Sequence, residues 1–381
     1  MSYRVLYIGG FELPDKNAAA FRVNANAGLL IEMGCTVYFR GVSKCNNIQD
    51  NFVKKGEFYC SEIKYPSSTK EWIKYSFTSE NVIKQIEKLH IDVVICYNYP
   101  SFALKKIIRY CHKNRVKVVN ECTEWYSSKG MGVLRGFIKK IDTLMRILLI
   151  PQIVDYNIVT TEYLAEKMKG RSCIIPEVYT IQTPYKEKPC ADITVNLIYM
   201  GTPGLKFNKD NIGKMVDILS NVNANYHFDI VGINEDEFFK HLCLNEGNYV
   251  KIKNRITFWG RVDHNRCIEM LSAADYTFLY RDVSKISLAG FPRKVSESLQ
   301  FNVPVITTKT SDLSKYIING KTGYVISFDK DKAAKEIEKI LRLGKKHSTS
   351  LKETISSSSP LLASRFRSQI NDMICALEEK R

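Results

Sequence analysis

The sequence predicts an α/β protein made of two Rossmann-like, doubly wound domains that face a cleft. Short apolar strands alternate with amphipathic helices along nearly the whole chain. The strands are apolar on both faces, which is typical of parallel sheets covered by helices on each side. The alternation stops once, over residues 180–194, and then begins again. At 381 residues the chain exceeds the usual size of one domain.

The first half contains four expected strands and three expected helices. The strands are YRVLYIGG, CTVYFRGV, DVVICYN and VKVVNEC, and the helices are AAFRVNANAGLLIEMG, TSENVIKQIEKLH and SFALKKIIRYCHKNR. Gly34 is expected to end the first helix, because glycine adopts the left-handed conformation of a helix end at little cost. This order of elements builds a parallel sheet, and we assign residues 1–185 to the first domain.

The polar segment TIQTPYKEKPCADIT, which contains two prolines, is expected to be a linker. A second domain over residues 186–345 follows it. Its strands are VNLIYMG, YHFDIVG, ITFWGRV, DYTFLYR and VPVITT, and its helices are NKDNIGKMVDILSNV, HNRCIEMLSAA, RKVSESLQF and DKAAKEIEKILRLG. We expect the Ser-rich stretch STSLKETISSSSP to interrupt the helices before a final helix, LLASRFRSQINDMICALEEK, within residues 346–381.

Composition narrows the class of protein. No apolar run is long enough to cross a bilayer, and MSYRVLYIGG is expected to be a first strand rather than a signal peptide. The eleven cysteines include no C-x-x-C pair, which favours reduced thiols in the cytoplasm over disulfides or zinc. The net charge of +16 favours an anionic partner, and residues 105–146 alone hold eleven Lys or Arg against three Asp or Glu.

The stretch AGFPRKVSESLQFNVPVITT contains the parts of a nucleotide-diphosphate site. Pro292 suits the first turn of a helix, and Gly290 lets a ligand approach the backbone closely. The free N–H groups and the dipole of a helix start attract phosphate. Glu297, about one and a half turns further on, is placed to accept hydrogen bonds from the vicinal hydroxyls of a ribose.

This stretch, followed by SDLSKYIINGKTGYVI, resembles the donor-binding motif of the retaining glycosyltransferases of family 4, which have the GT-B fold. The segments LIYMGTPG, FWGRV, RCIEMLSAADYTFLYR and DYNIVTTEYLAEKM extend the resemblance over most of the chain. The resemblance implies a nucleotide-sugar donor, a hydroxyl acceptor bound by the first domain, and a C-terminal helix that crosses back onto that domain.

The resemblance also implies roles for residues around the motif. Glu297 matches the second glutamate of the family's pair, which holds the ribose. The first glutamate, which contacts the donor sugar, falls at Ala289 here, so the backbone amides of Gly290 and Phe291 are expected to serve the sugar instead. Pro292 belongs to the same donor-binding turn. Further candidates for the diphosphate are Arg293, Lys294 and Arg281.

The family places an Arg and a Lys after the first strand of its second domain to neutralise the diphosphate. The loop here is GTPGLKFNKDN, which has no Arg, so Lys206 and Lys209 are the candidates. Gly201 leaves room for the backbone to bend around the ligand. Arg261 lies in the loop that packs near the base in this family. A solvated loop lysine is the alternative for Lys206 and Lys209.

In the first domain, GGFELPDKNAAAFRV resembles the family's glycine-rich first loop, with Gly9 and Gly10 close to the reacting groups and Arg22 on the next helix. Many members have a His after a middle strand, where this chain has VVNECTEWYSSKG. Candidates to orient a hydroxyl there are Glu124 or Glu121, and candidates to stack on a sugar are Trp125 or Tyr126. Core packing is the alternative for the aromatic pair.

The expected chemistry is metal-independent glycosyl transfer without a cofactor. Charge grows on the departing diphosphate, and fixed cations at that point give the largest stabilisation. No Asp-x-Asp motif ends a strand, and the six histidines lack ligand spacing, so no metal site is expected. A retaining enzyme of the family that the chain resembles needs no side-chain nucleophile. The expected role is surface polysaccharide or glycolipid assembly.

The stretch KGMGVLRGFIKKIDTLMRILLI predicts a basic amphipathic helix. Its apolar face holds Phe137, Ile141, Leu144 and Leu148, and basic side chains surround that face at positions 135, 139, 140 and 146. Residues 134–148 are therefore candidates to rest on the anionic inner face of the plasma membrane, near a lipid-linked acceptor. A core helix with solvated lysines is the alternative.

Two other functions fit parts of the sequence. A nucleotide-sugar epimerase of similar fold needs catalytic carboxylates and histidines that we cannot place. A basic nucleic-acid-binding protein would explain the charge, but no interleaved aromatic and basic motif is present, so no nucleic-acid partner is expected.

Overall fold

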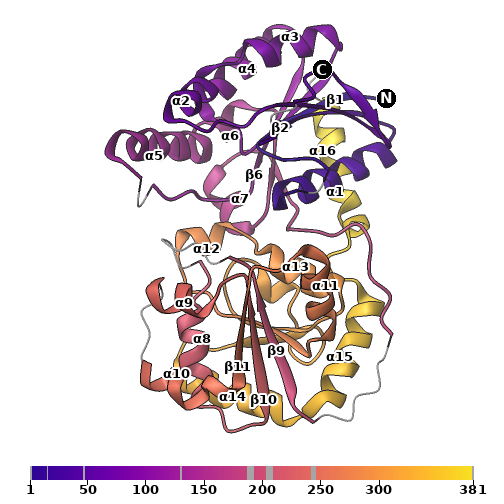
Figure 1. The fold of residues 1–381 in the computed structure, drawn as a ribbon. Coiled ribbons are helices and arrows are strands. Elements are labelled where there is room, and N and C mark those ends of the chain that lie inside the picture. Colours follow the sequence, from indigo (N-terminus) through magenta and orange to yellow (C-terminus); the bar gives the residue numbers. More distant parts are fainter. Residues whose placement is uncertain are drawn as a thin grey trace. The chain divides into compact units, whose positions relative to one another are not determined.

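The computed structural model describes residues 2–14, 16–45, 48–128, 131–186, 193–202, 209–241 and 246–379. The chain forms two compact units, one of Met1–Thr180 with Ala363–Arg381 and one of Ile181–Leu362. Each unit is built on a mainly parallel sheet with helices packed against it (Figure 1). The predicted α/β class, with two Rossmann-like domains, is confirmed.

The first unit contains an eight-stranded sheet in the order β3-β4-β2-β1-β5-β6-β7-β8. Its strands are β1 (Arg4–Gly9), β2 (Thr36–Ser43), β3 (Val53–Lys55), β4 (Phe58–Lys64), β5 (Val93–Tyr97), β6 (Lys117–Cys122), β7 (Tyr156–Val159) and β8 (Ser172–Ile174). Neighbouring strands pair in parallel except β3 and β4, which form an antiparallel pair at the edge. This pair was not predicted from the sequence, because β3 has only three residues, two of which are lysines.

Helices cover both faces of the first sheet. They are α1 (Ala18–Glu32), α2 (Thr69–Phe77), α3 (Glu80–Lys88), α4 (Ser101–Lys113), α5 (Val133–Leu148), α6 (Ile150–Ile153), α7 (Glu162–Met168) and, after the 3-10 turn η3 (Ala363–Phe366), α16 (Arg367–Glu379). Helices α1 and α16 lie together, and α3 and α4 lie together elsewhere on the sheet (Figure 1). The side chain of Asn17 caps the start of α1 by accepting a hydrogen bond from the N–H of Ala20.

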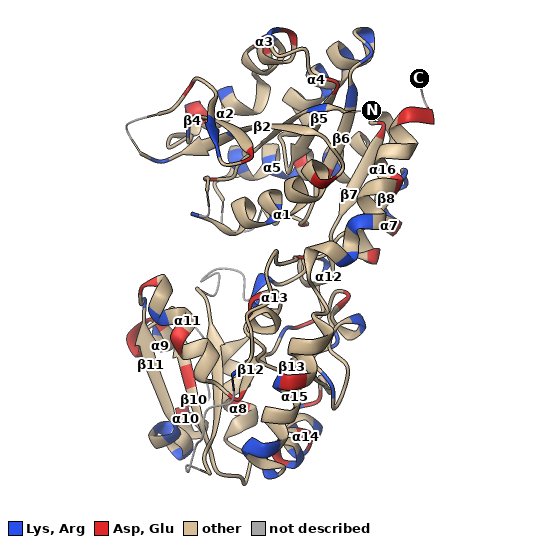
Figure 2. Cartoon of the chain, turned by 90° about the vertical axis from the view of Figure 1, so that its right-hand side faces the viewer, with Lys and Arg blue, Asp and Glu red and all other residues tan. Residues whose placement is uncertain are grey.

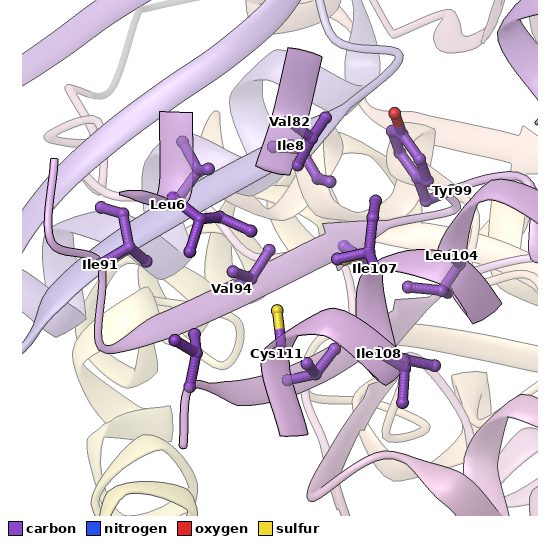
Figure 3. Packing of buried hydrophobic residues seen from close by; sticks show 14 of the residues in the cluster. Leu6, Ile8, Val82, Ile91, Val94, Tyr99, Leu104, Ile107, Ile108 and Cys111 are labelled. Carbon is purple, nitrogen blue, oxygen red and sulfur yellow. The ribbon is translucent and has the colours of Figure 1, made fainter. Parts of the chain in front are cut away.

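The core of the first unit explains why its strands read as continuous apolar runs. Leu6 and Ile8 of β1 pack in one cluster with Val94 of β5 and with Ile107 and Cys111 of α4 (Figure 3). Each of these side chains is fully or nearly fully buried. A parallel strand has helices over both faces, so residues at both odd and even positions along the strand are apolar.

The second unit contains a six-stranded parallel sheet in the order β11-β10-β9-β12-β13-β14. Its strands are β9 (Val195–Met200), β10 (Tyr226–Val231), β11 (Ile256–Gly260), β12 (Tyr276–Leu279), β13 (Val305–Thr308) and β14 (Gly323–Ile326). Its helices are α8 (Ile212–Leu219), α9 (Glu235–His241), α10 (Glu246–Ile252), α11 (His264–Ala273), α12 (Lys285–Ala289), α13 (Arg293–Gln300), α14 (Lys330–Arg342) and α15 (Gly344–Ser358), with 3-10 turns η1 (Lys253–Arg255) and η2 (Leu313–Lys315).

The Ser-rich stretch is helical, which corrects the expected interruption. It forms most of α15, where Leu351 and Ile355 are buried. The hydroxyl of Ser348 donates to Asp275, and Lys352 Nζ donates to the carbonyl of Ala274 at 2.6 Å. Serine has only a moderate helix propensity, and tertiary packing overrides it here.

The division of the chain differs in part from the sequence assignment. Residues 346–362 belong to the second unit, because α15 packs within it, and only 363–381 join the first unit. The boundary between the units falls after Thr180 rather than after residue 185. No helix in the described part of the chain is long and apolar enough to cross a membrane. The nine cysteines among the described residues are free thiols.

Candidate functional site

A buried carboxylate joins two cations at one end of the second sheet. Lys294 Nζ lies 2.7 Å from Asp210 Oδ2, and Arg281 Nε lies 3.3 Å from Asp210 Oδ1. The hydroxyl of Tyr199 donates to the same carboxylate at 3.0 Å. We call these four residues the cationic cluster. It contains two positive charges and one negative charge.

The topology of the sheet brings the cluster together. Tyr199 lies near the end of β9, Asp210 directly precedes the cap residue of α8, and Arg281 follows β12. Strands β9 and β12 are parallel neighbours, so their carboxyl ends meet at one edge of the sheet. Lys294 reaches the same edge from the first turn of α13. Figure 2 labels α13 and β12 and colours Lys and Arg residues blue. Ligands bind at this edge in doubly wound sheets.

The two cations fix the charge of the cluster. Burial alone raises the pKa of Asp210, but Lys294 and Arg281 outweigh burial and hold that pKa below its usual value. Burial and the neighbouring Asp210 raise the pKa of Tyr199 well above its usual value. The tyrosine is therefore a neutral donor and the aspartate an anion at neutral pH.

The glycines predicted for this site have different roles. A Cβ atom on Gly201 would lie 2.3 Å from Lys294 Cε, so a side chain there would push that lysine out of its position. Gly201 also has a φ of +137°, which L-residues rarely adopt. Gly290 has ordinary extended backbone angles, and its carbonyl accepts a hydrogen bond from Arg281 Nη1 at 3.2 Å.

The start of α13 presents uncapped backbone N–H groups. Pro292 stands at the cap position, and no side chain caps this helix. Phe291 packs edge-on against Tyr316, with ring centroids 5.5 Å apart. Glu297 remains partly exposed, and its Oε1 accepts a hydrogen bond from Arg293 Nε at 2.8 Å. This helix start therefore offers donors for an anion beside a carboxylate that reaches solvent.

Several predicted donor residues lie beside the cluster. Lys209 adjoins Asp210 in sequence and is partly exposed. Asp210 binds Lys294, which lies one helical turn before Glu297. The segments that contain Lys209 and Glu297 therefore meet at the same edge of the sheet. Ala289, at the position of the missing glutamate, is fully buried. Lys206 lies outside the described residues.

Arg261 is not part of the cluster. It lies after β11, is well exposed, and forms an ion pair with Glu237 at 2.8 Å. Within the described parts of the chain, no ion pair or hydrogen bond joins Arg261 to the cationic cluster. Arg261 nevertheless follows a strand of the same parallel sheet, so it lies at the same carboxyl edge as the cluster.

In the first unit, the predicted glycines lie at the carboxyl end of β1. A Cβ on Gly9 would meet the carbonyl oxygen of Tyr97 at 2.7 Å, so Gly9 is required for the packing of neighbouring strands. Gly10 has open space around it and lines a pocket of about 450 Å³. Trp125 is partly buried next to Tyr163, and the Glu124 carbonyl accepts a hydrogen bond from Arg146.

Arg22 and Glu121 are structural residues, which corrects their assignment to the acceptor side. Both are fully buried, and Arg22 Nε lies 2.5 Å from Glu121 Oε1. The hydroxyl of Tyr7 and the amide of Asn26 also donate to Glu121, and Arg22 Nη1 donates to the carbonyl of Pro176. Removing either charge would leave the other buried without its main partner.

Helix α5 exposes most of its predicted apolar face. Phe137, Leu144 and Leu148 are exposed large apolar residues, so the alternative of a core helix does not hold for this face. Arg146, expected among the solvated basic residues, is instead fully buried. Its guanidinium lies 4.4 Å from the ring centroid of Tyr126, and its Nη1 donates to Asn98.

No group of three or more His, Cys, Asp or Glu side chains within the described residues could hold a metal ion. Two residues of the cationic cluster, Tyr199 and Asp210, were not predicted from the sequence. A weak signal existed for Asp210, because this acidic residue follows two lysines and directly precedes a helix cap in a loop expected to bind phosphate.

Comparisons with known proteins agree with this geometry. Residues 197–356 match the family model described as glycosyl transferases group 1. No curated protein matches the chain by sequence. Similar solved structures include the sucrose-phosphate synthase of Thermosynechococcus elongatus, at 14% identity and a TM-score of 0.69 with 100% of both chains covered.

Two other similar structures also match nearly the whole of this chain. The lipopolysaccharide outer core galactosyltransferase WaaB has 13% identity and a TM-score of 0.62, covering 98% of this chain and 99% of that chain. Anabaena HepE in complex with UDP-glucose has 11% identity and a TM-score of 0.63, covering 98% and 100%. The whole chain thus has the two-domain GT-B fold, and residues 197–356 are similar to the glycosyl transferases group 1 family.

Proposed function

We propose that this protein is a retaining, metal-independent glycosyltransferase that moves a sugar from a nucleotide-diphosphate donor to a hydroxyl acceptor. The observation that carries the proposal is the cationic cluster beside the uncapped start of α13. Anabaena HepE, a structural neighbour, is described in complex with UDP-glucose. A nucleoside diphosphate-sugar is therefore the donor class that we assign to this chain.

The charge of the cluster suits a diphosphate. Asp210 neutralises only one of the two cations that it binds, so one positive charge remains for a ligand. Lys294 Nζ and the N–H groups at the start of α13 would bind the phosphate oxygens, with Lys209 and Lys206 as further cations. Such preorganised donors stabilise negative charge that develops in the transition state.

The reaction that we propose breaks the bond between the sugar C1 and the β-phosphate oxygen. A bond from C1 to the acceptor oxygen forms on the same face of the sugar, and the departing phosphate oxygen takes the acceptor proton. The transition state resembles an oxocarbenium ion, and negative charge grows on the phosphate. Lys294 and the α13 N–H groups act on that charge, so the chain's own cations can replace a metal ion.

Glu297 is the residue that we assign to the ribose. Its carboxylate is partly exposed on α13, about one turn beyond Lys294. A carboxylate can accept hydrogen bonds from two neighbouring hydroxyls. Ala289 is buried and has no polar side chain, so the backbone amides of Gly290 and Phe291 would serve the sugar.

The surface of α5 supports a role at a membrane. Its exposed apolar residues are flanked by Arg135, Lys139 and Lys140. We propose that this face rests on an anionic lipid surface, which places the protein on the inner face of the plasma membrane. The acceptor would then be a lipid-linked intermediate in surface polysaccharide or glycoconjugate assembly.

A donor panel tests the proposed reaction. The purified chain is incubated with UDP- and GDP-sugars in the presence of EDTA, and released nucleotide is measured. We expect turnover of at least one donor, and this turnover should be retained in EDTA. Lys209→Ala should slow it by raising the activation free energy by about 1–3 kcal/mol. The anomeric configuration of the transferred sugar is then read by NMR. An inverted product would exclude the retaining mechanism, and turnover that EDTA abolishes would exclude metal independence.

A further inference from the structure

The first unit contains a pocket of about 450 Å³ that is lined by residues of α2 and α5. Its floor is formed by Gly10, Tyr97 and Asn98, which lie at the carboxyl ends of β1 and β5. Its walls are mainly apolar and aromatic, with Trp72 and Tyr75 on α2. We call it the α2–α5 pocket. Its volume lies within the range of small-molecule sites.

One side of the pocket has an excess of positive charge. Lys139 and Arg135 line it, together with the single carboxylate of Asp142. Asp142 Oδ1 already accepts hydrogen bonds from the backbone N–H and the hydroxyl of Ser101. Lys139 Nζ is 3.7 Å from Asp142 Oδ2, which is longer than a hydrogen bond.

A third cation, Arg146, lies at the same tyrosine ring as Lys139. Lys139 Nζ is 4.1 Å and the Arg146 guanidinium is 4.4 Å from the ring centroid of the same residue, Tyr126. Arg146 is fully buried, and its Nε has no hydrogen-bond partner within the described structure. Burial and the positive charge of Arg146 lower the pKa of Lys139. An anionic group at this wall would offset the repulsion between the two cations.

Exposed apolar residues also line the pocket. Ile73 of α2 and Leu134 of α5 both line the pocket and are exposed to solvent, Leu134 by 65%. Met131, before α5, does the same. Phe137, one turn after Leu134, continues the exposed apolar surface. An apolar chain can therefore leave the pocket along α5 without crossing polar surface.

We propose that the α2–α5 pocket binds the acceptor and that this acceptor is an amphiphile, with a phosphate or diphosphate group at Lys139 and Arg135 and an apolar chain against the aromatic wall. That the ligand is the acceptor rests on the proposed glycosyl transfer. The chemical class of the ligand that the pocket binds does not depend on the donor site. The charge at one wall and the apolar opening favour a lipid phosphate over a free sugar.

Calorimetric titration with farnesyl diphosphate, a water-soluble lipid phosphate, tests the proposal. Farnesol and inorganic pyrophosphate serve as ligands that contain only one half of the amphiphile. We expect farnesyl diphosphate to bind at least tenfold more tightly than either half. Its binding should quench tryptophan fluorescence in the wild type and in Trp259→Phe but not in Trp72→Phe, because only Trp72 lines the pocket.

Matched variants locate the binding site. Leu134→Asp and Lys139→Gln should each weaken farnesyl diphosphate binding at least tenfold. Val133→Asp and Lys140→Gln, which alter exposed neighbours outside the pocket lining, should change it less than twofold. All four proteins should bind UDP as the wild type does. The proposal would be overturned if the two control variants lost as much farnesyl diphosphate affinity as the two pocket variants, because such losses would indicate unspecific adsorption.

The remaining outcomes separate this proposal from the proposed function. If the wild type binds UDP but not farnesyl diphosphate, the pocket assignment is wrong and the donor assignment stands. If it binds farnesyl diphosphate but not UDP, the donor assignment is wrong and the pocket's ligand class stands. Binding of pyrophosphate or farnesol as tight as that of farnesyl diphosphate would also reject the amphiphile.

Discussion

Gly201, directly after β9, and Lys294 in the first turn of α13 are in such close contact that a side chain at position 201 would displace the lysine. A Cβ atom on Gly201 would lie 2.3 Å from Lys294 Cε and 2.7 Å from its Nζ. The lysine reaches Asp210 across the space that glycine leaves. The contact links two segments that the resemblance assigns separately to phosphate binding.

Gly201→Ala should weaken UDP binding by at least tenfold, or about 1.4 kcal/mol. The added methyl group would push Lys294 Nζ away from its position beside Asp210, and the φ of +137° adds strain. Gly344→Ala is the control, since Gly344 also has a positive φ of +73° but has open space around it. Calorimetry gives the affinities and thermal unfolding gives the stabilities. If both variants bind UDP equally well, Lys294 does not depend on Gly201.

Lys294→Met should weaken UDP binding by about 1–3 kcal/mol, the range for a lost hydrogen bond between charged groups. Binding of UMP should weaken less, because UMP lacks the second phosphate. Lys214→Met is the matched control, since Lys214 also pairs with an aspartate, Asp282, at 2.5 Å in the same unit. Titrations of both nucleotides with both variants check the prediction. An equal loss for UDP and UMP would show that Lys294 does not act on the diphosphate.

Glu297→Ala should remove the preference for ribose. The wild type is expected to bind UDP more tightly than 2′-deoxy-UDP, because the carboxylate accepts a hydrogen bond from the 2′ hydroxyl. In the variant the two affinities should become equal, with a loss of about 1–3 kcal/mol for UDP. Glu269→Ala, which removes an exposed carboxylate paired with Arg266, should keep the preference. A preference that survives in Glu297→Ala would show that another group reads the ribose.

The sequence predicted the parts of the fold that depend on local pattern. Strands such as β1 and β5 are apolar on both faces and end at glycine or polar residues, so their type and order follow from periodicity. The helix α15 could not be predicted in this way. Its serines have moderate propensity, and its stability comes from Leu351 and Ile355 packing in the second unit.

The candidate site was only partly predictable for a related reason. The α13 motif is contiguous, so its residues could be found by their spacing. Asp210 and Lys294 are 84 residues apart, and nothing local indicates that they form an ion pair. The same holds for Arg22 and Glu121, whose burial depends on the packing of α1 against the sheet. Spacing along the sequence therefore could not give the partner of each buried charged side chain.

The pH dependence of stability should reveal the charge of Asp210. Its pKa is lowered from 3.8 in the folded state, so its ion pairs stabilise the fold above that value and are lost as the pH falls through the lower folded pKa. Asp210→Asn should lower stability by about 3–5 kcal/mol at pH 7, because two cations lose their partner. The gap between wild type and variant should narrow below about pH 4.

Thermal unfolding between pH 3 and 7 measures this gap. Glu353→Gln, which alters an exposed carboxylate of α15, should follow the wild-type curve over the whole range. A gap between wild type and Asp210→Asn that stays constant down to pH 3 would show that the pKa of Asp210 is the same in the folded and the unfolded protein, so that its ion pairs do not lower it.

The exposed face of α5 should bind anionic lipid bilayers. Phe137 is 62% and Leu148 is 47% exposed, and burying such side chains contributes about 1.5–3 kcal/mol each. The double variant Phe137→Ser with Leu148→Ser should therefore bind phosphatidylglycerol vesicles at least tenfold more weakly in a sedimentation assay. The control variant Val250→Ser with Leu343→Ser removes two similarly exposed apolar residues of the second unit and should bind as the wild type does.

Raising the salt concentration should weaken vesicle binding by the wild type, because salt screens the basic side chains around the exposed face of α5. Equal vesicle binding by the two double variants would exclude α5 as the membrane-contacting element.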